Sequence, residues 1–97
     1  MNQHKDIKNF LKKIIKDLND LKAIDIKFID IKNRSALGDF LIIVTGNSTR
    51  HINAIATKII ENYKKKVISV EGLKSTEWVI VDFGDIILNV FKHDARE

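Results

Sequence analysis

The chain has 97 residues, of which 44% are hydrophobic and 31% charged, with a formal net charge of +4 and no cysteine. This length suits one domain with one core, the composition is too apolar for a disordered chain, and the lack of cysteine excludes disulfides and thiolate metal sites. No apolar run approaches the roughly 20 residues of a membrane helix and the N-terminus lacks a signal-peptide stretch, so we expect a cytoplasmic protein without a membrane partner.

The first part of the chain predicts one helix and two strands. Apolar residues recur at a spacing of three and four across residues 5–21, which indicates an amphipathic helix. Residues 24–29 alternate in the manner of a strand, and Phe28 fits a core pattern. Residues 40–45 (FLIIVT) form a continuous apolar run, which is typical of a strand covered on both faces.

A second helix and three strands are expected in the remainder. Gly46-Asn47-Ser48 interrupts the apolar run, and Ser48 can cap the next helix by accepting a backbone N–H. An apolar stripe from Ile52 to Tyr63 predicts this helix, and Lys64-Lys65-Lys66 closes it, where cations suit the helix dipole. The expected strands are residues 67–70, 78–82 and 86–91, with a tight turn at 83–85 between the last two.

The predicted order, α-β-β-α-β-β-β, describes a single α/β (α+β) domain over residues 1–97 with a five-stranded mixed sheet. We expect the first two strands to be antiparallel and the last two to form a hairpin. The strand–helix–strand unit from Phe40 to Val70 should be a right-handed parallel crossover.

The candidate catalytic features each have a structural explanation. Nucleotidyltransferases use a Gly-Ser turn like the one ending at Ser48, but they follow it with two metal-binding carboxylates, and here the first acidic residue is Glu61. The two aspartates that flank Phe83-Gly84 suit a turn better than a cation site. Arg50-His51 has no nucleophile placed with it, so this pair either contacts a partner or lies on a solvated helix face. We therefore expect no enzymatic activity, no metal and no cofactor.

Nucleic-acid binding receives limited support. The lysine clusters and the pI of about 9.4 would allow weak phosphate contacts. No strand combines aromatic and basic residues in the way that stacking on bases requires. The lysines mostly fit the polar faces of helices, so we expect little or no direct nucleic-acid recognition.

The segment around Trp78 is the strongest candidate for a partner contact. Residues 71–97 contain 3 Lys or Arg and 6 Asp or Glu, whereas residues 1–70 contain 14 and 7. A tryptophan at a strand start among carboxylates suits contact with a basic protein. Packing of Trp78 in the core explains the same pattern equally well.

Several motifs in combination resemble the ribosomal silencing factor family (RsfS, also called Iojap). They are Asp39-Phe40, residues 45–51 (TGNSTRH), Ala54, Ala56, Glu71-Gly72, residues 78–85 (WVIVDFGD), Val90-Phe91 and Arg96. The resemblance implies a nucleotidyltransferase-like core without catalytic carboxylates. It also implies a translation repressor that binds the large ribosomal subunit at ribosomal protein L-fourteen and blocks joining of the small subunit.

This resemblance narrows the expected contact residues. They are Trp78, Asp82, Phe83 and Asp85, followed by Glu71 and Arg50. Trp78 and Phe83 would be apolar anchors, and the carboxylates would meet lysines and arginines of the ribosomal protein. An exposed apolar hairpin would also favour a homodimer of the free protein.

The chain departs from the family pattern at two points. Asn89 stands where the family usually has a histidine in the last strand, and asparagine can keep a hydrogen bond there. The chain ends at Glu97, whereas family members continue with a tail that could cover the sheet or the docking face. Two alternative functions stay open: an RNA-binding ribosome-assembly factor and a degenerate nucleotidyltransferase-like enzyme.

Overall fold

The computed structural model describes residues 3–31, 38–73 and 77–93, and in these ranges it confirms the predicted order of elements. The elements are α1 (Gln3–Asp20), β1 (Ile24–Asp30), β2 (Phe40–Gly46), α2 (Thr49–Asn62), the 3-10 turn η1 (Lys64–Lys66), β3 (Ser69–Glu71), β4 (Trp78–Asp82) and β5 (Ile86–Lys92). The lysine run therefore forms a separate turn after Tyr63. The expectation that these lysines close α2 is wrong.

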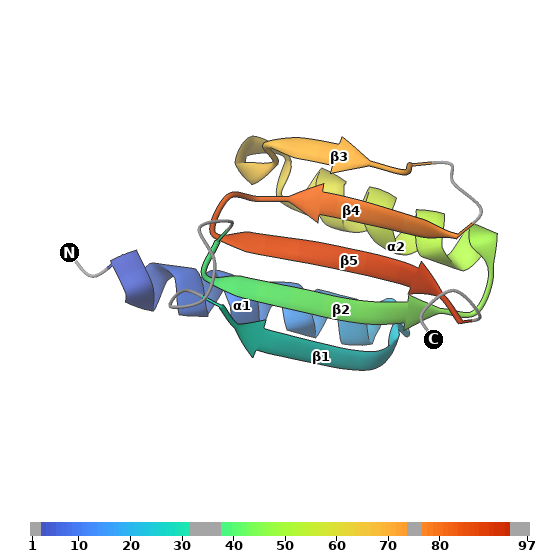
Figure 1. Ribbon diagram of the computed structural model, residues 1–97, viewed down its shortest axis with the longest axis horizontal. Coiled ribbons are helices and arrows are strands. Elements are labelled where there is room, and N and C mark those ends of the chain that lie inside the picture. Colours follow the sequence, from blue (N-terminus) through green and yellow to red (C-terminus); the bar gives the residue numbers. More distant parts are fainter. Residues whose placement is uncertain (1–2, 32–37, 74–76, 94–97) are drawn as a thin grey trace.

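The strands form one mixed sheet in the order β1-β2-β5-β4-β3 (Figure 1). β1 pairs antiparallel with β2, and β4 with β5, as predicted. β2 and β5 are parallel, and β3 is antiparallel to β4. β3 consequently runs in the same direction as β2, as a strand–helix–strand crossover requires, but β5 and β4 are inserted between them.

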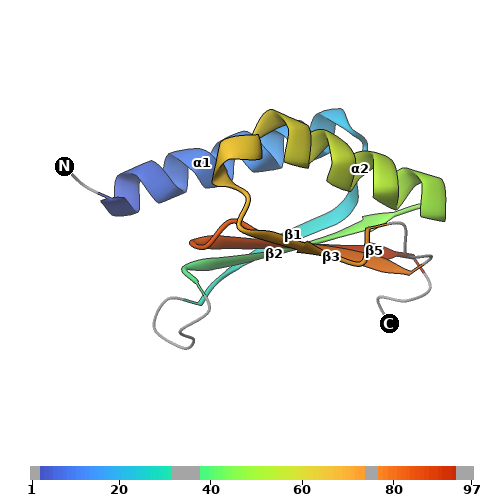
Figure 2. The ribbon, with the colours of Figure 1, turned by 90° about the horizontal axis from the view of Figure 1, so that it is seen from above.

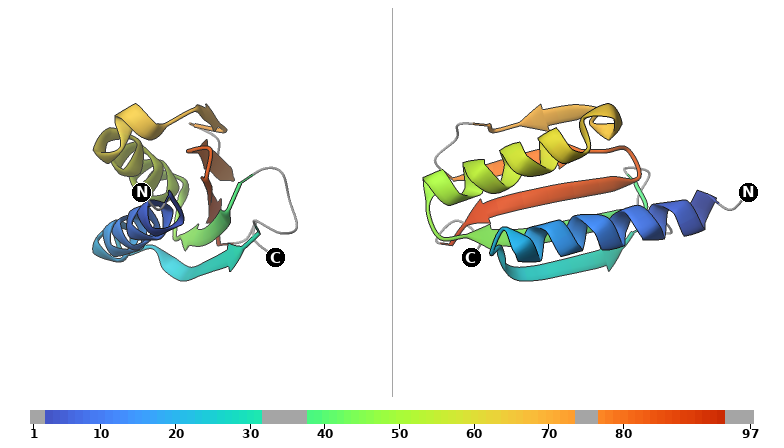
Figure 3. Two further views of the ribbon diagram at one scale, coloured as in Figure 1. Left: turned by 90° about the vertical axis from the view of Figure 1, so that its left-hand side faces the viewer. Right: turned by 180° about the vertical axis from the view of Figure 1, so that it is seen from behind.

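Both helices lie on one face of the sheet (Figures 2 and 3). The prediction that β2 is covered on both faces is therefore wrong: Phe40, Ile42 and Val44 face the helices and are buried, while Leu41 and Ile43 face away and are half-buried. Periodicity alone could not reveal this, because an apolar run is equally compatible with one helix layer and a second, uncovered apolar face.

The core lies between the helices and the sheet. α1 contributes Leu11, Ile14 and Leu18, all exposed by 5% or less. The other buried hydrophobic residues are Phe40, Ile42, Val44, Ile52, Ile55, Ala56, Ile59, Val79, Val81, Phe83, Ile86, Leu88 and Val90. Burial of each large aliphatic side chain contributes about 1.5–3 kcal/mol, so this single interface supplies most of the driving force for folding.

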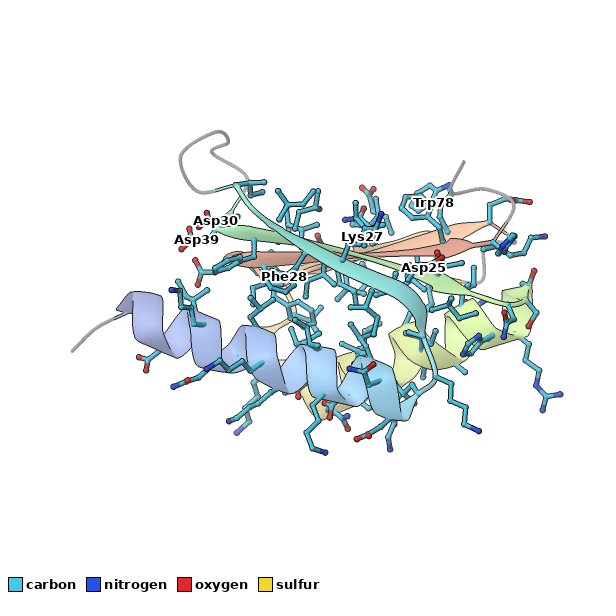
Figure 4. All side chains as sticks on the ribbon, turned by 90° about the horizontal axis from the view of Figure 1, so that it is seen from below. Asp25, Lys27, Phe28, Asp30, Asp39 and Trp78 are labelled. Carbon is cyan, nitrogen blue, oxygen red and sulfur yellow. The ribbon has the colours of Figure 1, made fainter. Side chains whose placement is uncertain are left out.

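A bulge near the start of β1 changes which of its apolar residues face the core. Ile24 pairs with Thr45 and Phe28 with Ile42, so these two apolar residues lie on opposite faces of the sheet. Asp25 has a φ of 50° within this irregularity. Phe28 points toward the helix layer (Figure 4) but is 54% exposed, which corrects the expectation of a core position.

An aromatic cluster and one polar contact join α1 to the C-terminal end of α2. The ring centroids of Phe10 and Tyr63 are 5.0 Å apart and those of Phe10 and Phe83 are 5.3 Å apart, both edge-on. The Tyr63 hydroxyl donates a short hydrogen bond to the Asp17 carboxylate. Burial, this bond and the nearby negative charge raise the pKa of Tyr63, so the phenol remains neutral beside the carboxylate.

α1 ends in a Schellman motif centred on Lys22. The N–H of Ala23 donates to the carbonyl of Leu18, and the N–H of Lys22 donates to the carbonyl of Asn19. Lys22 has a φ of 62°, in the left-handed region where a β-carbon is unfavourable and glycine is usual.

Lys22→Gly should raise the free energy of unfolding by about 0.5–1 kcal/mol, because relief of the left-handed strain exceeds the added entropy of the unfolded chain. Urea denaturation would measure the change. Lys13→Gly, on an exposed position inside α1, is the matched control and should destabilise by about 1 kcal/mol. Equal destabilisation by both substitutions would contradict this account of Lys22.

Candidate functional site

The sheet face that points away from the helices is uncovered by any element of the described residues (Figure 2). We call this surface the open face. Its residues on β2, β5 and β4 are Leu41, Ile43, Trp78, Ile80, Asp82, Ile87, Asn89 and Phe91. All are half-buried, whereas the apolar residues that alternate with them, Phe40, Ile42, Val44, Val79, Val81, Ile86, Leu88 and Val90, are buried against the helices.

Strand register makes the open face a continuous patch. Trp78 lies opposite Phe91, and Ile80 lies opposite Asn89. In the parallel pair, Asn89 is in register with Ile43. The result is a mainly apolar surface across three adjacent strands. Contiguous apolar surfaces of this kind mark interaction sites in soluble proteins.

Asn89 places a polar amide at the centre of this patch. Its Nδ2 donates to the carbonyl oxygen of Ile42 over 3.4 Å, a long and therefore weak bond. The residue at the position where the resemblance leads us to expect histidine thus lies directly on the open face, between Ile80 and Ile43.

Trp78 belongs to the open face and not to the core. Figure 4 shows its side chain on the side of the sheet opposite the helices. Gly72 packs against it: a β-carbon there would lie 2.8 Å from two atoms of the indole and 2.4 Å from the Trp78 carbonyl oxygen. Gly72 also has a φ of 80°. The Glu-Gly pair is thereby explained, because only glycine fits both the backbone conformation and the contact.

The two nearest predicted carboxylates flank the patch. Glu71 is exposed on β3, opposite Ile80. It therefore lies close to the contact between Gly72 and the Trp78 indole. Asp82 is half-buried at the far end of β4, and its Oδ1 accepts the Gly84 N–H at 2.7 Å. Asp82 therefore holds the β4–β5 turn and also contributes negative charge to the open face.

Phe83 and Asp85 do not join this patch. Phe83 is 6% exposed and packs edge-on against Phe10, so the expectation of an apolar anchor is wrong for the folded chain. Asp85 is exposed in the β4–β5 turn, which is at the other end of β4 from Trp78, and its carbonyl accepts the N–H groups of Asp39 and Phe40.

Arg50 and His51 differ in their surroundings. Arg50 is exposed in the first turn of α2, beside Lys92 and His93, at the sheet end where Trp78 lies but in the helix layer. His51 is structural: its Nδ1 accepts the Asn47 N–H at 2.9 Å, and its Nε2 lies 3.0 Å from the Leu21 carbonyl. Neither alternative foreseen for this histidine, partner contact or solvated face, accounts for it.

Ser48 caps α2 as predicted, since its Oγ accepts the His51 N–H at 3.1 Å. Within residues 3–31, 38–73 and 77–93, no group of three or more His, Cys, Asp or Glu side chains could hold a metal ion. In the same ranges no helix is long and apolar enough to cross a membrane.

The apolar members of the open face were missed by sequence reasoning. Leu41 and Ile43 were assigned to a doubly covered strand, and Ile87 only to the sheet. The numbers of predicted helices and strands could have revealed them, because two helices of about 10 Å diameter cover only one face of a five-stranded sheet. Every apolar residue alternating with the core positions was therefore a candidate for a docking surface.

Comparison with known proteins identifies a family. Residues 4–97 match the model of the family "RsfS: Ribosomal silencing factor during starvation". The chain is 35% identical to the Bacillus subtilis protein "Ribosomal silencing factor RsfS", over 92% of this chain and 78% of the relative. It is 28% identical to the Mus musculus protein "Mitochondrial assembly of ribosomal large subunit protein 1", over 82% of this chain and 38% of that protein.

A solved structure confirms the fold. A crystal structure of a Chromobacterium violaceum protein superposes with a TM-score of 0.81 at 31% identity, covering 89% of this chain and 74% of that one. The agreement extends to the two helices and the mixed sheet, so the open face belongs to a fold already observed experimentally.

Gly72→Ala should displace the Trp78 ring and shift its fluorescence emission, because the new methyl group overlaps the indole. The strained φ adds a destabilisation of about 1–2 kcal/mol. Trp78 is the only tryptophan, so the emission spectrum reports on it directly. Ser69→Ala, at an exposed position of β3 opposite Asp82 and therefore away from the indole, is the control and should leave the spectrum unchanged. An unshifted spectrum in Gly72→Ala would refute the contact.

Proposed function

Because this chain belongs to the ribosomal silencing factor (RsfS, or Iojap) family, we propose that it represses translation by binding the large ribosomal subunit and blocking attachment of the small subunit. The family consists of non-enzymatic ribosome-binding factors, and this chain is a member without a catalytic role. The name of the mouse relative supports the large subunit as the target.

The open face is the single observation that carries the proposal. It presents an aromatic anchor, Trp78, at the start of β4, where the ring lies on the same face as Phe91 and adjoins the aliphatic residues of the sheet. Large aromatic residues on an apolar patch are the usual hot spots of protein interfaces. We infer that this face contacts ribosomal protein L-fourteen, with residues 1–97 acting as one domain.

Charge favours a basic protein as the partner. Glu71 and Asp82 lie at two sides of the apolar patch, and Asp85 extends the acidic border into the β4–β5 turn. Carboxylates at the rim steer a basic partner and set its register more than they add affinity. Arg50, at the Trp78 end, is a peripheral contact in this proposal. Phe83 serves the interface only indirectly, by holding the turn against the core.

The bacterial relatives support the cytoplasm as the place of action, since bacterial ribosomes are cytoplasmic. We further propose that the free protein forms a homodimer through the open face. An apolar patch of this kind is shielded from water when two copies meet face to face. The dimer then opens on the ribosome, so that the open face of one copy contacts the ribosomal protein.

Trp78→Ala should weaken binding to large ribosomal subunits by about 30-fold or more, as expected for loss of an aromatic hot spot. Co-sedimentation with separated large and small subunits would measure it. Asp82→Asn keeps an acceptor for the Gly84 N–H but removes the charge, so it should weaken binding several-fold and flatten its dependence on salt.

The matched control is Ile68→Ala, which truncates an apolar residue that is 68% exposed and lies outside the open face. Its binding should equal that of the wild type. Circular dichroism and thermal melting verify that each variant remains folded. Undiminished binding by folded Trp78→Ala, or an equal loss in Ile68→Ala, would eliminate the open face as the ribosome contact.

Ile43→Lys places a charge at the centre of the open face and should convert a dimer of the free protein into a monomer in sedimentation velocity experiments. Ile68→Lys introduces the same charge elsewhere and should remain dimeric. A monomeric wild type, or a dimer that persists in Ile43→Lys, would contradict the proposed dimer without affecting the ribosome contact.

A further inference from the structure

A second apolar surface lies in the helix layer, between α1 and the edge strand β1. It is a groove of about 570 Å³. Its apolar lining comes from Leu11 and Ile15 of α1 and from Phe28 and Phe40 of the sheet. The groove is on the opposite side of the sheet from the open face, so the proposed ribosome contact does not use it.

Phe28 shows that no element of residues 3–31, 38–73 and 77–93 covers this groove. Its pairing with Ile42 directs the side chain to the same face as the core, yet 54% of it is exposed. Seen from the helix side, β1 extends along α1 at the border of the sheet, outside the area that the two helices cover (Figure 3, right). An aromatic side chain in this position exposes a large apolar area beside the core.

The dimensions of the two layers explain the gap. Five strands about 4.8 Å apart make a sheet wider than two helices of about 10 Å diameter can cover. α2 and α1 pack side by side and leave the β1 edge free. A third helix lying along α1 would complete the layer and cover Phe28.

The helix side of the groove is lined with cations. Lys8, Lys12 and Lys16 are exposed and follow one another at four-residue intervals, which places them in a row about 6 Å apart. Lys16 forms an ion pair with Asp20 over 3.1 Å, but both side chains are largely exposed, so this pair is weak. Within the described part of the chain, Lys8 and Lys12 form no ion pair.

We propose that this groove binds an amphipathic helix of a partner protein, whose acidic residues at four-residue spacing meet the lysine row while its apolar face covers Phe28. The repeat of the lysines matches the repeat of side chains along one face of a neighbouring helix. Apolar residues at helical spacing would fill the groove beside Leu11 and Ile15, as in other helix-in-groove complexes.

A fluorescein-labelled 18-residue helical peptide, with leucines on one face and glutamates every fourth residue beside them, tests this proposal by fluorescence anisotropy. Binding should weaken about tenfold or more in Phe28→Ala and in the double variant Lys8→Glu/Lys12→Glu. The control Lys64→Glu/Lys65→Glu makes the same change of net charge outside the groove and should bind within about twofold of the wild type.

Three results would overturn the proposal. They are no binding of the peptide to the wild type, equal loss of binding in both double variants, and equal binding of a peptide with lysine in place of each glutamate.

Other occupants of the groove are tested with the same variants. A homodimer that dissociates in Phe28→Ala would assign the groove to a second copy of the chain. Displacement of the peptide by dodecanoate at equimolar concentration would assign it to a small amphiphile.

Discussion

One-sided packing of the sheet is the constraint on which the rest of this structure depends. Both helices bury the same face, so Ile42, Val44, Leu88 and Val90 form one continuous core with the helical stripes. Backbone pairing then forces every alternate strand residue onto the opposite side. A chain of this size thus folds around one apolar interface and presents a second one, of related composition, that no element of the described residues covers.

The uncovered face is maintained by local devices and not by burial. Gly72 allows the chain after β3 to pass against the Trp78 ring, and Asp82 secures the turn that follows β4. Phe83 anchors that turn in the aromatic cluster with Phe10. These contacts make the open face rigid before any partner binds, which reduces the entropy cost of association. A preformed surface of this kind suits a member of a family of ribosome-binding factors.

The candidate site was only partly predictable. Trp78, Glu71 and Asp82 could be proposed from motifs, because unusual residues at strand starts and turns are visible in one dimension. Phe83 could not be distinguished from its neighbours, since the same local sequence is compatible with an aromatic turn residue that points into the core and with one that points into solvent. His51 was equally ambiguous, because its two ring contacts involve the backbone of Asn47 and of Leu21, the latter 30 residues away.

By itself, the sequence determined the elements, their order, the cap at Ser48 and the membership of a family, because periodicity, capping and motifs are local properties of the chain. Only the tertiary structure decided which face of each strand the helices would cover. The bulge beside Asp25 and the limited width of the helix layer left Phe28 exposed, although its pattern is that of a core residue. Exposure depends on where other elements pack, and that information is distributed over the whole chain.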